Sequence, residues 1–299
     1  MPCAGATARQ LEWAVRQGRL RRLRRGVLCP APVWAGADLP GRAALLAKAQ
    51  VLASPAEPAV ASHVTAAALL GLPVPDDAAA RVWGTVPPGR RARRDELVVQ
   101  QSASLEPGEV VVVDGLPCTS PLRTVTDCLR HLPPLDAVPL ADAALRAGLV
   151  TAQELEAAVT ERRWPRSAAA SALLPLLDGR RESVLESRSA VVMHLAGVPA
   201  PQEQVRILDA GGRFVARVDF WWPDAGVVGE ADGLVKYAGD DAARVVAQEK
   251  AREARLRALG LVVVRWTAAM LHGDPPLMVV QVRAALAAGD GDRFRGRVA

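Results

Sequence analysis

The chain has 299 residues, of which 50% are hydrophobic and 23% are charged, and it carries a formal net charge of +5. This length fits two or more compact domains, and this balance of apolar and charged residues excludes a disordered chain. The sequence has no run of about 18 uncharged apolar residues and no signal-peptide core at its N-terminus, so we expect no membrane partner. The four cysteines lie far apart without C-x-x-C spacing, which argues against a zinc site and favours a reducing cytoplasm.

Residues 1–30 are predicted to form a small basic module. Thr7 and Gln10 have the spacing of a helix-capping box, and Gly18 ends the helix. The helix is followed by an arginine-rich strand, and residues 1–30 contain seven arginines against one glutamate. A helix followed by a basic ribbon is typical of a winged helix-turn-helix, in which the ribbon contacts DNA phosphates. The predicted contact residues are Arg19, Arg21, Arg22, Arg24 and Arg25. The alternative is a solvated basic hairpin.

Residues 31–178 are predicted to form an α+β region that is rich in helices. The expected helices cover 41–53, 62–71 and much of 135–159, and the expected strands lie near 80–85, 97–101 and 109–113. Within 114–127 a strand leads into a helix capped at Thr119 or Ser120, and on that helix Arg123 and Asp127 are spaced to form an ion pair.

Two features of this middle region have open interpretations. His63 has no serine or cysteine nucleophile in a recognisable setting beside it, so a structural or phosphate-contacting role is expected. The arginine cluster at 90–94 contacts phosphates or forms a solvated loop. Residues 1–30 and 114–127 together resemble the AbiEi family of antitoxins, which are DNA-binding transcriptional autoregulators. The resemblance implies DNA and a cognate toxin protein as partners, and an N-terminal module truncated relative to the family.

Residues 213–237 are predicted to form two strands around a turn. Phe214, Ala216, Val218 and Phe220 alternate with more polar residues, and residues 223–226 have turn chemistry. A four-residue loop pairs residue 222 with residue 227 and sets residue 219 opposite residue 230, with Cβ atoms about 5 Å apart.

The strand pair brings three carboxylates together. They belong to Asp219, Glu230 and Asp232. Carboxylates that converge in this way repel one another, and a hard cation such as Mg²⁺ or Mn²⁺ is the usual reason to keep them.

The arrangement resembles the PD-(D/E)xK nuclease fold and, within it, the branch of the very-short-patch-repair endonuclease. The resemblance covers about residues 182–285 and implies a restriction-endonuclease-like mixed sheet. We expect this domain at 179–289, followed by a tail at 290–299. The motif lysine is replaced by Asp232, so the resemblance implies that Lys236 or Lys250 supplies the missing charge, while Glu186 completes the metal shell from its helix.

These observations predict an α/β protein with an α+β N-terminal part. The expected function is that of a DNA-binding, metal-dependent DNA endonuclease of the cytoplasm, which hydrolyses phosphodiester bonds. The alternative is a non-catalytic transcriptional regulator or antitoxin of a toxin-antitoxin or phage-defence system, in which the nuclease-like domain is a binding scaffold.

Overall fold

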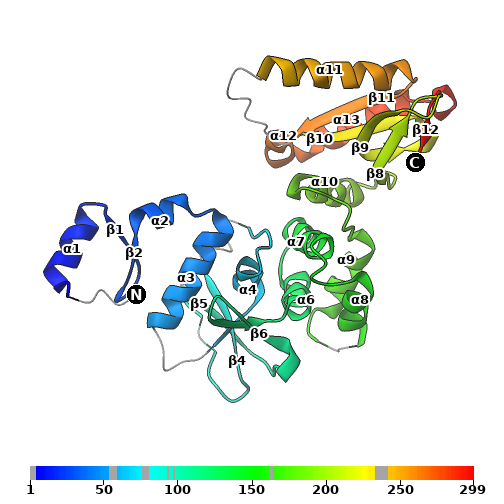
Figure 1. Ribbon diagram of the computed structural model, residues 1–299. Coiled ribbons are helices and arrows are strands. Elements are labelled where there is room, and N and C mark those ends of the chain that lie inside the picture. Colours follow the sequence, from blue (N-terminus) through cyan, green and yellow to red (C-terminus); the bar gives the residue numbers. More distant parts are fainter. Residues whose placement is uncertain are drawn as a thin grey trace. The chain divides into compact units, whose positions relative to one another are not determined.

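The protein is an α/β protein with mixed sheets, which divides into two compact units, Met1–Pro175 and Leu176–Ala299 (Figure 1). A computed structural model describes residues 5–53, 59–75, 81–92, 94–96, 98–161, 164–232 and 242–299. Lys236 therefore lies outside the described residues. Within those ranges, no helix combines the length and apolar character needed to cross a lipid bilayer.

The N-terminal unit contains helices around a basic ribbon and a five-stranded sheet. Its helices are α1 (Ala8–Arg16), α2 (Ala31–Gly36), α3 (Leu39–Ala53), α4 (His63–Leu69), α6 (Pro121–His131), α7 (Pro134–Arg146), α8 (Ala152–Glu161) and α9 (Ser167–Leu173). Its strands are β1 (Leu20–Arg24), β2 (Val27–Pro30), β3 (Val60–Ala61), β4 (Val82–Val86), β5 (Val98–Ser102), β6 (Val110–Val113) and β7 (Leu116–Thr119). The large sheet has the order β5-β4-β3-β7-β6 and the ribbon is the antiparallel pair β1-β2.

The predicted capping box is confirmed at the start of α1. The Thr7 side chain accepts the backbone N–H of Gln10, and the Gln10 side chain accepts the backbone N–H of Thr7. Gly18, with φ at +68°, takes the left-handed conformation in which the chain leaves the helix. The ribbon that follows contacts α3, which lies beyond the predicted module boundary at residue 30.

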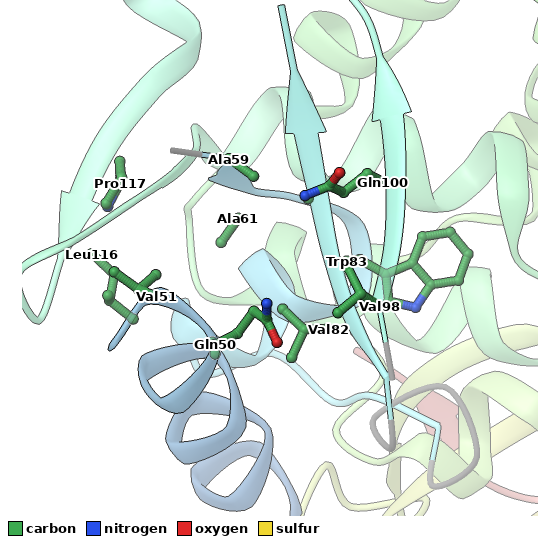
Figure 2. Close-up of a pocket in the computed structure, with 12 residues that line it drawn as sticks. Gln50, Val51, Ala59, Ala61, Val82, Trp83, Val98, Gln100, Leu116 and Pro117 are labelled. Carbon is green, nitrogen blue, oxygen red and sulfur yellow. The ribbon is translucent and has the colours of Figure 1, made fainter. Parts of the chain in front are cut away.

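Helix α3 approaches one face of the large sheet. Gln50 and Val51 of this helix, with Val82 and Val98 of the neighbouring strands, line a small pocket of about 40 Å³ (Figure 2). A pocket of this size, walled mainly by alkyl groups, holds little more than a water molecule and is a packing gap of the core.

A buried ion network anchors α6. The carboxylate of Asp127 is 1% exposed and accepts from Arg123 at 2.9 Å and from Arg130 at 3.0 Å. The predicted Arg123–Asp127 pair is therefore confirmed. The helix is capped by Ser120, whose hydroxyl accepts the backbone N–H of Arg123.

The C-terminal unit is a mixed five-stranded sheet covered by helices on both faces (Figure 1). Its strands are β8 (Gln202–Leu208), β9 (Phe214–Trp222), β10 (Val227–Asp232), β11 (Val262–Thr267) and β12 (Arg297–Val298). Its helices are α10 (Val184–Leu195), α11 (Ala242–Ala258), α12 (Ala268–Gly273) and α13 (Pro275–Ala288). The strand order is β11-β10-β9-β8-β12, in which β10 and β11 are parallel and the other pairs are antiparallel.

The two faces of this sheet have separate cores, and β9 changes sides between them. Phe220 and Trp222 pack with α10, α12 and α13, whereas Ala216 and Val218 pack with Leu256 of α11 on the other face. Simple alternation places residues 216, 218 and 220 on one face, whereas in the structure residues 216 and 218 belong to one core and residue 220 to the other.

Residues 290–299 are not the tail that the sequence suggested. Strand β12 pairs with β8, and the Phe294 ring contacts Trp221 with ring centroids 5.3 Å apart. The chain also passes close to Gly260, where a Cβ atom would lie 2.2 Å from the carbonyl oxygen of Arg293. Because these last residues complete the sheet edge and its core, they belong to the folded unit.

Candidate functional site

The predicted strand register holds around the β9–β10 turn. Val227 pairs with Trp222 and Gly229 with Phe220, so Asp219 is the residue of β9 next to the last of these pairs. The Asp219 Oδ2 atom accepts the backbone N–H of Ala231 at 2.9 Å. The carboxylate of Asp219 therefore lies against β10, the strand that carries Glu230.

Gln204 of β8 is the residue that the sequence analysis missed. Its φ angle is +56°, a left-handed conformation that costs a residue with a side chain about 1–3 kcal/mol inside a strand. The register of β8 and β9, which pairs Glu203 with Phe220 and Val205 with Val218, sets it opposite Asp219. Its amide Nε2 donates to Glu186 Oε2 at 2.8 Å and to Asp219 Oδ1 at 3.3 Å. The NH₂ group of Gln204 thus contacts both carboxylates and occupies the position in which a cation would bind them.

The amide oxygen of Gln204 is buried and has no hydrogen-bond partner among the described residues. Native proteins seldom bury a polar atom without a partner, so this oxygen is a candidate ligand atom. Glu186 is 6% exposed, and Ser183, the N-cap of α10, donates its hydroxyl to Glu186 Oε1 at 2.7 Å. The helix cap therefore fixes the direction in which Glu186 points.

Asp219 has a perturbed acidity. Burial, together with the negative charges of Glu186 and Glu230, raises the pKa of Asp219 to about 6, although the hydrogen bond from Ala231 favours the ionised form. A carboxyl whose charge is opposed by burial and by neighbouring carboxylates is the environment that a bound cation relieves.

Glu230 is held by two arginines. Its carboxylate is 2.6 Å from Arg252 of α11 and 3.3 Å from Arg265 of β11, and burial raises its pKa even though both arginines lower it. Arg265 also contacts Asp232 at 2.9 Å. Glu249 lies three residues before Arg252 on α11, within reach for an intrahelical pair, but the guanidinium of Arg252 contacts Glu230. Glu230 and Asp219 thus lie on neighbouring strands, but their carboxylates have different partners.

The lysine predictions have no supporting contact. Lys250 is exposed on α11, and Lys236 falls outside the described ranges. The positive charges next to Glu230 and Asp232 are instead guanidinium groups. Within the described part of the chain, no group of three or more His, Cys, Asp or Glu side chains has the geometry to hold a metal ion. The cluster that does form combines two carboxylates, Glu186 and Asp219, with the amide of Gln204.

The arginines of the β1–β2 ribbon fall into two groups. Arg22 and Arg25 are exposed, and Arg21 is exposed with its guanidinium 4.4 Å from the centre of the Trp34 ring. Arg19 is likewise exposed and lies over the ring of Trp13. Arg24 differs, because it is 8% exposed and donates to Gln50 of α3 at 3.1 Å. The burial of Arg24 argues against its predicted phosphate contact and gives it a role in holding the ribbon on α3.

Comparison with known proteins places the chain in a family. No protein-family model and no solved structure matches it. The uncharacterized protein Rv2248 of Mycobacterium tuberculosis strain H37Rv is 36% identical over 208 residues, which cover 69% of this chain and 73% of that protein. The uncharacterized protein MT2308 of strain CDC 1551 matches with the same identity and coverage. With this identity spread over more than two thirds of each protein, the chain belongs to the same family as Rv2248 and MT2308.

Proposed function

We propose that the C-terminal unit is a divalent-cation-dependent nuclease domain and that the N-terminal unit binds DNA. The observation that carries the proposal is Gln204, whose strained backbone places an amide between the carboxylates of Glu186 and Asp219. Strained residues that also bury unpaired polar atoms are concentrated at functional sites. The resemblance of residues 182–285 to the PD-(D/E)xK fold supports the same assignment.

The donor set suits a hard cation such as Mg²⁺ or Mn²⁺. Asp219 and Glu186 offer carboxylate oxygens, and rotation of the Gln204 amide would turn its unpaired oxygen toward both. A cation bound there polarises a phosphodiester and lowers the pKa of a water molecule. Asp219, with its pKa of about 6, is ionised at neutral pH and ready to bind the cation.

The arginines beside Glu230 supply the positive charge that the family motif gives to a lysine. Arg265 contacts Glu230, Asp232 and Glu253, so its guanidinium is held in place by three carboxylates. A guanidinium stays protonated at any physiological pH and binds phosphate oxygens in a bidentate manner. Arg252 and Arg265 thus place fixed positive charge beside the carboxylates, but neither can remove a proton from water. We therefore expect slow cleavage.

The alternative function is that of a non-catalytic regulator or antitoxin, with a toxin protein as its partner. The observation that favours it is the pairing of Glu230 and Asp232 with Arg265, which neutralises two of the three predicted metal ligands. A nuclease fold whose acidic residues are neutralised internally binds DNA without cutting it.

A plasmid-nicking assay with Mg²⁺ or Mn²⁺ separates the two functions. We expect the wild type to nick the plasmid slowly. The nicking rate of Asp219→Asn should be at least about a hundredfold lower, as is usual when a key stabilising group is removed from an enzyme. The matched control is Asp224→Asn, which removes an exposed carboxylate from the turn between β9 and β10 and should leave the rate unchanged. If the wild type neither binds a divalent cation in calorimetry nor nicks, the regulator is the better account.

DNA binding is tested through its salt dependence. Each phosphate contact that is lost should flatten the slope of log K against log salt by about 0.9. We expect the double variant Arg22→Ala, Arg25→Ala to flatten this slope, and Arg213→Ala, an exposed arginine of the C-terminal unit, to leave it unchanged. An unchanged slope in the double variant would mean that the ribbon is a solvated hairpin.

A further inference from the structure

A second site is indicated by buried polar atoms in the N-terminal unit. Among the described residues, five buried side-chain atoms lack a hydrogen-bond partner. Gln204 Oε1 belongs to the C-terminal cluster, and Arg265 Nε lies 2.9 Å from Asp232 in an ion pair. The other three are His63 Nε2, Trp83 Nε1 and Thr85 Oγ1. Since such atoms are rare in native proteins, their grouping indicates a place that is built for a ligand.

His63, the first residue of α4, contacts Trp83 of β4, and Thr85 lies two residues from Trp83 on the same strand. Trp83 and Thr85 alternate on β4 and therefore share one face of the sheet. The indole ring of Trp83 extends away from Val51 and Leu116, which line the apolar pocket (Figure 2). Its centroid is 5.2 Å from that of His63, which is 2% exposed and has a strained φ of +50°.

A cavity of about 420 Å³ opens beside this group. Its polar lining consists of Trp83, Arg94, Gln100, Gln101, His131 and Arg166. His63 is not among the lining residues, but its ring centroid is 4.8 Å from that of His131, which is. The volume falls in the usual range for small-molecule sites, and it exceeds the apolar pocket about tenfold.

The charge of the cavity selects an anion. Arg94 and Arg166 are exposed at its edge, and none of the described lining residues carries a carboxylate. Arg166 also has a left-handed backbone, with φ at +65°. Two guanidiniums without an acidic partner in the lining attract an anion, and their planar donor groups match the oxygens of a phosphate.

The interior of the cavity offers hydrogen bonds and aromatic surfaces. His131 Nδ1 lies 2.9 Å from the carbonyl oxygen of Asp127 and must donate to it, so Nε2 accepts from Gln101 at 3.1 Å. Burial and the nearby Arg130 and Arg166 lower the pKa of His131, which favours the neutral ring. The unpaired Trp83 Nε1 group remains as a donor for a bound molecule.

We infer that this cavity binds a single nucleotide through its 5′-phosphate and its base. The phosphate contacts Arg94 and Arg166, while the base lies against Trp83 and accepts its indole N–H. The chemistry is shared by a free mononucleotide and by the terminal nucleotide of a 5′-phosphorylated strand. The site lies in the unit that does not contain Asp219, so its test is independent of nuclease activity.

Calorimetric titration of the full chain without divalent cations tests the inference. The probes are the four ribonucleoside 5′-monophosphates, inorganic phosphate, and a short oligonucleotide with either a 5′-phosphate or a 5′-hydroxyl. The double variant Arg94→Ala, Arg166→Ala removes two exposed guanidiniums, and Arg213→Ala, Arg293→Ala is the control of equal charge from exposed positions of the C-terminal unit. Trp83→Phe keeps an aromatic ring but removes the N–H donor.

Each charged hydrogen bond that is lost should weaken binding about tenfold or more, so the Arg94, Arg166 variant should lose at least a hundredfold. The control should stay within about twofold of wild type, and Trp83→Phe should lose about tenfold. Binding of a mononucleotide identifies the free ligand, and binding only of the 5′-phosphorylated strand identifies a strand end. The inference is overturned if no probe binds, if phosphate binds as tightly as a nucleotide, or if the Arg94, Arg166 variant binds normally.

Discussion

Replacement of Asp219 by asparagine should stabilise the C-terminal unit at neutral pH. In the folded protein the pKa of Asp219 is raised from the ordinary 3.8 to about 6. The folded state therefore holds a proton between these two values that the unfolded state has already released. Stability is highest below the lower value and falls as the pH rises through the higher one. An asparagine has no charge to bury and is spared this loss.

The size of the effect follows from the same shift. A change from 3.8 to about 6 corresponds to at most about 3 kcal/mol, because each pKa unit is worth about 1.4 kcal/mol. Since Asp219 is partly exposed, solvent screening should reduce the measured gain to about 1–2 kcal/mol. The introduced amide can keep the bond from Ala231 through its oxygen, but its N–H₂ group then faces Gln204 Nε2, so the 3.3 Å bond from that amide is lost.

The assay is urea unfolding at several pH values between 4 and 7.5. Unfolding is monitored by hydrogen exchange of peptides from β9 and β10. This readout reports the C-terminal unit separately from the tryptophans of the N-terminal unit. The advantage of Asp219→Asn over wild type should grow between pH 4 and pH 6 and then stay constant, while Asp224→Asn shows no such trend. At pH 7.5, Mg²⁺ should reduce the difference in unfolding free energy between Asp219→Asn and the wild type, because it stabilises the wild type alone. An advantage that does not change with pH would refute the assigned acidity.

Two further substitutions test the cores of the two units. Asp127→Ala leaves Arg123 and Arg130 buried without their shared carboxylate, so we expect a loss of about 3–5 kcal/mol in thermal unfolding of the N-terminal unit. Gly229→Ala places a Cβ atom 2.8 Å from the ring of Trp266, and this overpacking should cost about 1–3 kcal/mol in urea unfolding. A wild-type midpoint for either variant would contradict the packing described for that unit.

The local elements of the C-terminal unit were predictable from the sequence because they depend on neighbours in the chain. Four turn residues between two apolar strands set the pairing of Trp222 with Val227. Ser183 caps α10 in the same local way, because its hydroxyl accepts the backbone N–H of Glu186 three residues later. Such features follow from capping and turn chemistry, which operate over four or five residues.

The site itself depends on contacts between distant segments, so only part of it is predictable from the sequence. Asp219 and Glu186 belong to recognisable patterns, but Gln204 lies in the unremarkable run Gln-Glu-Gln-Val, and its left-handed backbone has no local cause. Arg252 had a suitable partner one turn away in Glu249, and tertiary packing gave it Glu230 instead. Helix spacing predicts only which pairs are possible, because packing decides which of them form.

Strain and unpaired polar atoms coincide in both units, and this coincidence links the two proposed sites. His63 and Arg166 in one unit and Gln204 in the other have left-handed backbones, which each cost about 1–3 kcal/mol. The unpaired atoms of His63, Trp83 and Gln204 add about 1–3 kcal/mol each. A domain has a free energy of unfolding of only about 5–15 kcal/mol. We therefore expect strained backbones and unpaired polar atoms at places where a bound ligand offsets their free-energy cost. Each unit should therefore gain stability from its own ligand and not from the other's: a divalent cation for the C-terminal unit and a nucleotide for the N-terminal one.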